Sequence, residues 1–132
     1  MMAEVIVAPD AEGRAVAFLK AQFAARGDSA KAGTKFPAKG SSRFVQVTRA
    51  GGISNDIAYD APRLIFICSG ESSVDAERLC ALTRGLVLAW ARLSDDVTRV
   101  RDAGDMAYVP DPDSGQDRYQ FAAQAVMKMS AI

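Results

Sequence analysis

The chain has 132 residues, 49% of them hydrophobic, and its 16 basic and 16 acidic side chains give a formal net charge of zero. This length predicts one domain over 1–132, with 1–9 as a short flexible N-terminus. A neutral chain argues against a dedicated nucleic-acid-binding module, which is normally clearly basic. The lack of histidine removes the commonest general base and most zinc-site chemistry.

The sequence also argues against membrane insertion and export. No stretch reaches the roughly 18 uninterrupted apolar residues of a membrane span, and the N-terminus lacks the basic start of a signal peptide. We therefore expect a protein that is made in the cytoplasm and contacts no membrane. The two cysteines, Cys68 and Cys80, lie in apolar runs and are expected to be buried thiols, with a single disulfide between them as the alternative.

The first predicted helix covers 10–26. Asp10 is a suitable N-cap, and Gly27 ends the periodic pattern. One face of this helix carries Val16, Leu19 and Phe23. A loop rich in Gly, Ser, Lys and Pro follows over 27–42, with one short strand expected near 34–37.

Two strands are expected next, over 43–49 and 63–69. The first should end in a turn at 50–52, and the second should begin after Pro62. Because 64–68 is apolar at every position, we expect the second strand to be central and covered on both sides, by helices or by a partner subunit.

The strongest helix prediction covers 73–93, with Ser72 as N-cap and Asp75 three residues on. Its apolar stripe is Leu79, Leu82, Leu86, Trp90 and Leu93. The remainder is a predicted hairpin with arms over 97–102 and 118–129. The pattern predicts an α+β fold, a mostly antiparallel sheet of four or five strands with two main helices packed on one face.

No arrangement of residues points to catalysis or to a bound cofactor. No glycine-rich phosphate loop ends in Lys-Ser or Lys-Thr, and no serine has a histidine to activate it. The pairs Asp95–Asp96 and Asp111–Asp113 are read as solvated turns rather than as cation ligands. We expect a protein that is not an enzyme, with no cofactor and no metal.

The charges are nonetheless segregated along the chain. An acidic hairpin over 102–117 contains aspartates and no lysine or arginine, and a basic loop over 26–43 is opposed only by Asp28. Candidate interface or lumen residues on the acidic hairpin are Asp105, Tyr108, Asp111, Asp113, Asp117 and Arg118. The complementary candidates on the basic loop are Lys31, Lys35, Lys39 and Arg43.

These two segments are either ordinary solvated loops or two halves of a contact between subunits. Contact between unlike surfaces is head-to-tail and closes into a ring when the rotation allows. If the basic loop receives the acidic hairpin, charge reversal at Lys35 and Lys39 should shift oligomer to monomer in light scattering. A mass unchanged between low and high salt would contradict that contact.

Several segments together carry a resemblance to a known family. They are the helix opening at 16–19, the strand with its Gly-Gly end at 43–52, the run Asp60-Ala61-Pro62-Arg63-Leu64 with the apolar strand behind it, and Pro110-Asp111-Pro112-Asp113-Ser114-Gly115 followed by Arg118-Tyr119. In this order and spacing the chain, over about 11–129, resembles tail-terminator proteins of long, non-contractile-tailed phages, especially those of actinobacterial hosts.

The resemblance implies a structural role in the virion. Such a protein forms a ring, usually a hexamer, on the head-proximal end of the tail, where it stops polymerisation of the major tail tube protein. It then joins the tail to the head–tail connector, and DNA passes through the lumen without specific binding. The chain would be synthesised in the host cytoplasm and end in the virion. Aspartates of the acidic hairpin in the lumen would repel DNA phosphates.

Two other readings stay open. One is another neck component, a head-closure or connector protein, which shares the size and the habit of assembly. The other is a small ligand-binding or enzymatic α+β domain, which would need a deep pocket with convergent polar groups.

Overall fold

The computed structural model describes residues 5–38, 43–53 and 58–131. The elements in chain order are β1 (Ile6–Val7), α1 (Ala11–Ala25), β2 (Lys31–Gly33), β3 (Phe44–Ile53), β4 (Tyr59–Ser69), α2 (Ser73–Leu88), α3 (Trp90–Leu93), β5 (Arg99–Tyr108), β6 (Arg118–Lys128) and β7 (Ser130–Ala131). No helix in these ranges is long and apolar enough to cross a membrane.

Five strands form the main sheet in the order β2-β3-β4-β6-β5. β2 runs parallel to β3, and the other three neighbouring pairs are antiparallel. The α+β class is therefore confirmed, with a mixed sheet. The short strand of the basic loop lies at Lys31–Gly33 rather than near 34–37.

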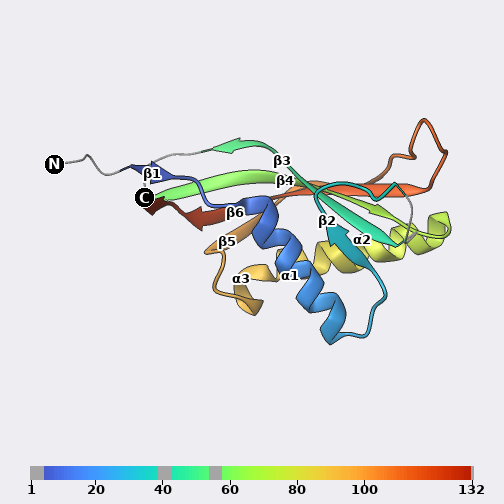
Figure 1. The fold of residues 1–132 in the computed structure, drawn as a ribbon, viewed down its shortest axis with the longest axis horizontal. Coiled ribbons are helices and arrows are strands. Elements are labelled where there is room, and N and C mark those ends of the chain that lie inside the picture. The colour runs from blue at the N-terminus through green and yellow to red at the C-terminus, as the bar shows by residue number, and fades with distance from the viewer. Residues whose placement is uncertain (1–4, 39–42, 54–57, 132) are drawn as a thin grey trace.

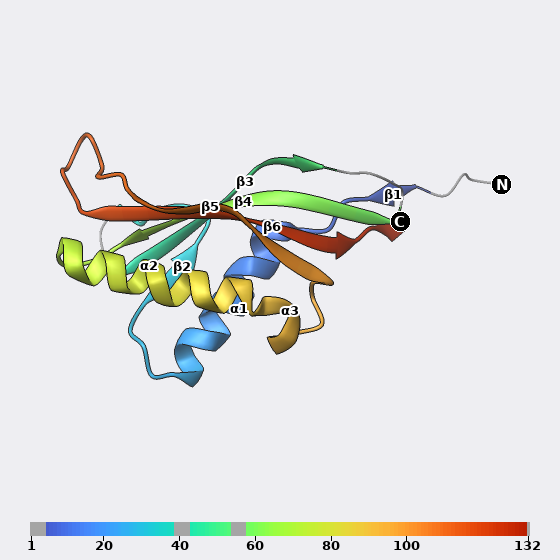
Figure 2. The same ribbon diagram turned by 180° about the vertical axis from the view of Figure 1, so that it is seen from behind.

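All the helices cover the same face of this sheet (Figures 1 and 2). Their cap residues are those expected from the sequence. Asp10 accepts a hydrogen bond from the Gly13 amide at 3.0 Å, and Ser72 accepts one from the Asp75 amide at 3.1 Å. The opposite side of the sheet, called the helix-free face below, has no helix on it in the described chain.

The central strand is β4, as the apolar run predicted, but only one of its faces is fully buried. Leu64, Phe66 and Cys68 point into the core beneath the helices, while the alternate Ile65 and Ile67 are only half-buried. Helices therefore cover one face of β4 in this subunit, as expected of the two main helices, and the expected cover on the other face would have to come from a partner subunit.

The expected turn at 50–52 is instead a bulge within a longer strand. β3 continues to Ile53, and its register with β4 shifts between Arg49 and Gly52. Gly52 has a φ of 126°, and a Cβ there would lie 2.3 Å from the Ala61 carbonyl oxygen. Pro62 lies within β4, opposite the bulge. A proline, which cannot donate a backbone hydrogen bond, is tolerated there because the ladder is already interrupted.

The long helix predicted over 73–93 is interrupted at Ala89, giving α2 and the short α3. Leu79, Leu86 and Trp90 of the expected stripe are buried, but Leu93 is 46% exposed. Trp90 stacks on Phe18 of α1 at 5.1 Å between ring centroids. On the sheet, Phe66 stacks on Phe121 of β6 at 4.8 Å. These pairs join the helices and the central strands into one core.

Both cysteines are buried free thiols, as predicted. Burial, and then the neighbouring Cys80, raise the pKa of the Cys68 thiol well above its usual range.

The two ends of the described chain pair with each other. Ile6 and Val7, expected in a flexible N-terminus, form β1 and pair antiparallel with β7. This small sheet lies at the opposite end of the elongated molecule from the connection between β5 and β6 (Figure 1).

Candidate functional site

The connection between β5 and β6 is a compact loop of residues 109–117, called the tip loop below. It rises on the helix-free side at one end of the molecule (Figures 1 and 2). Asp111 organises it: its carboxylate accepts hydrogen bonds from the Ser114 hydroxyl at 2.6 Å and amide at 3.3 Å, and its carbonyl accepts from the Gly115 amide at 2.8 Å. The Ser114 hydrogen bond, with help from Arg118, lowers the pKa of Asp111.

Arg118, at the start of β6, connects the acidic hairpin to the basic loop within one subunit. Its guanidinium lies 3.8 Å from the ring centroid of Phe36 and 3.7 Å from the Asp111 carboxylate. Phe36 in turn packs against Phe44 at 5.4 Å. The two oppositely charged segments singled out in the sequence therefore lie beside each other.

The tyrosine pair at the base of the tip loop closes the hairpin. Tyr108 donates a hydrogen bond from its hydroxyl to Asp117 at 2.6 Å, and its ring lies 5.2 Å from that of Tyr119. The Asp117 hydrogen bond raises the pKa of Tyr108. Tyr108 is nevertheless 49% exposed, and the adjacent Val109 is 43% exposed. The base of the loop thus presents apolar surface beside its carboxylates.

The acidic segment is shorter as a loop than the sequence suggested. Asp102 and Asp105, with Tyr108, lie on β5, which extends six residues beyond the expected arm. Both aspartates pair with Arg84 of α2, at 3.4 and 3.5 Å. Among the aspartates of 102–117, all of which lie in the described ranges, only Asp113 has a carboxylate without a hydrogen-bond or ion-pair partner. It is exposed at the tip of the loop.

The residues of the basic loop have unlike roles. Lys31 lies on the edge strand β2, and both it and Lys35 are exposed. Lys39 falls outside the described residues. Arg43, in contrast, is largely buried.

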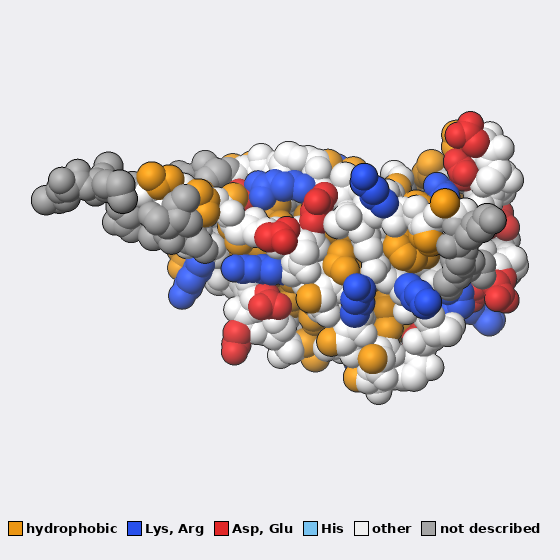
Figure 3. Space-filling view, viewed as in Figure 1, with side chains coloured by type: hydrophobic (Ala, Val, Ile, Leu, Met, Phe, Trp, Pro, Cys, Tyr) orange, Lys and Arg blue, Asp and Glu red, His pale blue; other side chains and the backbone are white. Residues whose placement is uncertain are grey.

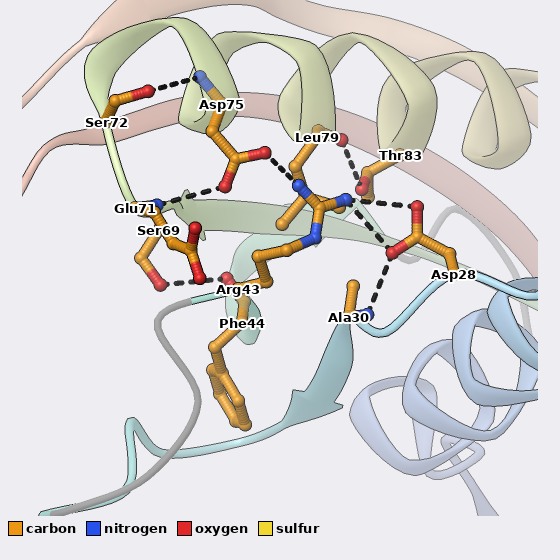
Figure 4. Close-up of polar contacts among 10 residues, drawn as sticks. All are labelled: Asp28, Ala30, Arg43, Phe44, Ser69, Glu71, Ser72, Asp75, Leu79 and Thr83. Carbon is orange, nitrogen blue, oxygen red and sulfur yellow. Dashed lines mark hydrogen bonds and ion pairs between the residues drawn. The ribbon is translucent and has the colours of Figure 1, made fainter.

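Arg43 bridges two parts of the fold (Figure 4). Its guanidinium donates to Asp28, at 3.0 Å, and to Asp75 at the start of α2. Burial alone would raise the pKa of Asp28, but the Ala30 amide and Arg43 outweigh it, and the pKa is lowered. Arg43 therefore anchors the loop after α1 to α2, and unlike the exposed Lys31 and Lys35 it is engaged within the subunit.

The structure contains a second candidate surface that the sequence did not indicate. A pocket of about 220 Å³ opens on the helix-free face at the end of the sheet far from the tip loop. Its main lining residues are Ile53, Tyr59, Arg99, Arg101, Gln124 and Val126. The arginines alternate along β5 and pair across the ladder with Val126 and Gln124, which is why they share one face. We call this surface the arginine pocket.

The described residues contain no cluster of His, Cys, Asp or Glu that could hold a metal ion. No protein-family model matches the chain, and no curated protein matches it in sequence.

Proposed function

We propose that this chain is a tail-terminator subunit: it forms a ring that caps the head-proximal end of a phage tail tube and provides the joint to the head connector. The mechanism is binding, without catalysis. One side of the ring would contact the last tube subunits. The other side would bind the connector and would not bind further tube protein.

The β5–β6 hairpin carries this proposal. It contains the segment on which the family resemblance rests most strongly, Pro110 to Gly115 in the tip loop followed by Arg118 and Tyr119 at the start of β6. The tip loop itself adds no residue to the core. It instead forms a loop braced by its own hydrogen bonds, which rises from one end of the sheet (Figure 1). Such a preorganised projection suits a docking element, because little conformational entropy is lost when it binds.

The helix-free face is the second supporting feature. Ile65 and Ile67 are only half-buried there, beside Gln120 and Gln124 on β6. A mixed apolar and polar sheet surface of this kind suits contact with protein on one side and with a water-filled lumen on the other.

Polymerisation of purified tube protein tests the proposal. Added at the start, the chain should shorten the tubes and be found at one of their ends in electron micrographs. An unchanged length distribution, with no chain bound to tube ends, would contradict tail termination.

Co-purification separates this role from that of another neck protein. A tail terminator should bring down tube protein and, once on a tube, the connector. Binding to the portal complex alone would assign the chain to head closure.

A further inference from the structure

The arginine pocket carries positive charge that the fold does not neutralise. Neither Arg99 nor Arg101 has an ion-pair partner among the residues that the structure describes, and both are exposed on β5. Arg63 of β4 lies on the same face, opposite Gln124 of β6. The pocket's one described carboxylate, Asp60, is 2% exposed and is paired with Arg49 at 2.8 Å. The pocket is therefore suited to an anionic group.

The tip loop carries the matching charge. Asp113 is exposed at its tip, with Asp111 and Asp117 behind it. Acidic side chains are visible at this projecting end in the space-filling view (Figure 3). The internal bonds of Asp111 hold the backbone in place, so that Asp113 is presented on a rigid support.

Exposed apolar residues flank the charges at both sites. Tyr108 and Val109 are 49% and 43% exposed at the base of the tip loop, and Ile53 and Tyr59 are 53% and 39% exposed at the rim of the pocket. Each site thus offers apolar surface next to charge, and the charges are opposite. This is the composition of a protein interface with an anchoring centre and a charged rim.

The two sites cannot meet within one molecule. Arg99 begins β5 and Tyr108 ends it, and ten residues of strand at about 3.3 Å each separate them by roughly 30 Å. Contact between them must therefore join two copies. Because the two surfaces differ, copies can join head-to-tail through this contact, and such a chain of copies closes into a ring where the rotation allows.

We infer that the tip loop of one copy inserts Asp113 into the arginine pocket of the next copy. Resting on the proposed function, this inference identifies the contact between neighbouring subunits of the ring. We place the receiving surface in the pocket rather than in the basic loop, where Arg43 is already bound to Asp28 and Asp75 and only exposed lysines are described as unengaged.

Charge reversal tests this contact in the full chain. Sedimentation velocity at about 0.05 M salt, where charges are weakly screened, measures association. Arg99→Glu/Arg101→Glu and, separately, Asp113→Lys should each weaken association about tenfold or more, because like charges then face each other. Combining Asp113→Lys with Arg101→Glu should restore association to within about threefold of the original chain.

Two controls carry the same type of charge change. Arg78→Glu/Arg92→Glu alters exposed arginines on the helix side and should leave association unchanged. Lys31→Glu/Lys35→Glu tests the basic loop, and it too should have no effect. Circular dichroism must show that each variant is folded, and Asp113→Lys, on a loop, tests the contact even if the strand variants do not fold.

Three outcomes would overturn the inference: association that Asp113→Lys does not weaken, failure of the combined variant to restore it, or a chain that never associates. Loss of duplex DNA binding in Arg99→Glu/Arg101→Glu with association intact would also overturn it, by making the pocket a phosphate site. Results that relocate or exclude the contact while association persists leave the proposed function to the tube-shortening test, whereas a chain that associates neither in solution nor on tube ends would count against both.

Discussion

At the scale of single residues, Arg43 shows that burial can give a charged side chain a structural role that its sequence context does not indicate. In the sequence it belongs to a run of basic residues, and its position there suggested an exposed contact. In the fold its side chain is only 20% exposed and lies between carboxylates from two different segments. Neither carboxylate is a neighbour in sequence, so nothing local distinguishes Arg43 from Lys31 or Lys35.

Replacing Arg43 with methionine should destabilise the fold. The change leaves Asp28 and Asp75 partly buried without their cation, and we expect the free energy of unfolding to fall by about 2 kcal/mol. Urea denaturation measures this. Lys31→Met, which removes an exposed charge from the same loop, should cost less than about 0.5 kcal/mol. Equal losses in the two variants would show that the bridge adds no stability.

Acid should weaken the same bridge. The pKa of Asp28 is lowered in the folded chain, so its stabilisation is fully present above about pH 4 and is lost as the pH falls through the folded value. The stability difference between the original chain and Asp28→Asn should therefore shrink below about pH 4. Denaturation curves at several pH values measure it, and a constant difference down to pH 2 would contradict this account.

At the scale of elements, the periodicity of the apolar residues predicted the presence of helices and strands more accurately than it predicted their ends. The period of the apolar residues located both main helices, the central β4 and the alternating β6. The ends of β3 and β4 were missed because the Gly51–Gly52 bulge lets a strand continue through residues that usually make a turn. The parallel pairing of β2 depends on contacts with β3 across the intervening loop and leaves no local signal.

The candidate site was predictable only in part, for a similar reason. The acidic residues of the hairpin are close in sequence, so the sequence alone singled them out. The arginine pocket is assembled from the ends of four strands, and its residues become neighbours only through the register of the sheet. Alternation of Arg99 and Arg101 along β5 was the one local signal, and it becomes informative only when the pairing with β6 is known.

Neighbouring residues of β4 test the one-sided burial of the sheet. Phe66→Ala removes a fully buried ring stacked on Phe121, and should lower the free energy of unfolding by about 3–5 kcal/mol. Ile67→Ala, on the helix-free face, should cost clearly less, about 1 kcal/mol. Chemical denaturation of the unassembled subunit measures both. Similar costs would mean that this face is also fully packed.

Asp111 should control the order of the tip loop rather than the stability of the whole chain. Asp111→Ala removes the Ser114 hydrogen bonds and the Arg118 ion pair, so amide exchange within 109–117 should become faster. The melting temperature should change little, because the loop lies outside the core. Asp113→Ala is the matched control, and equal acceleration in both variants would show that Asp111 does not brace the loop.

At the scale of the whole molecule, the main feature is the difference in charge between its two ends. The subunit is elongated and carries the braced tip loop at one end (Figure 1). The arginine pocket opens near the other end. In the proposed ring, the tip loop of each copy would meet the pocket of the next, while the helices of every copy lie on one side of its sheet. The two rims of that ring would differ, as the proposed cap between a tube and a connector requires.

The most direct measurement is the length of tails assembled with and without this protein, seen in electron micrographs. If the chain terminates tails, its removal should give overlong tubes that lack heads, and supplying it again should restore the normal length. Tubes of normal length in its absence would contradict tail termination.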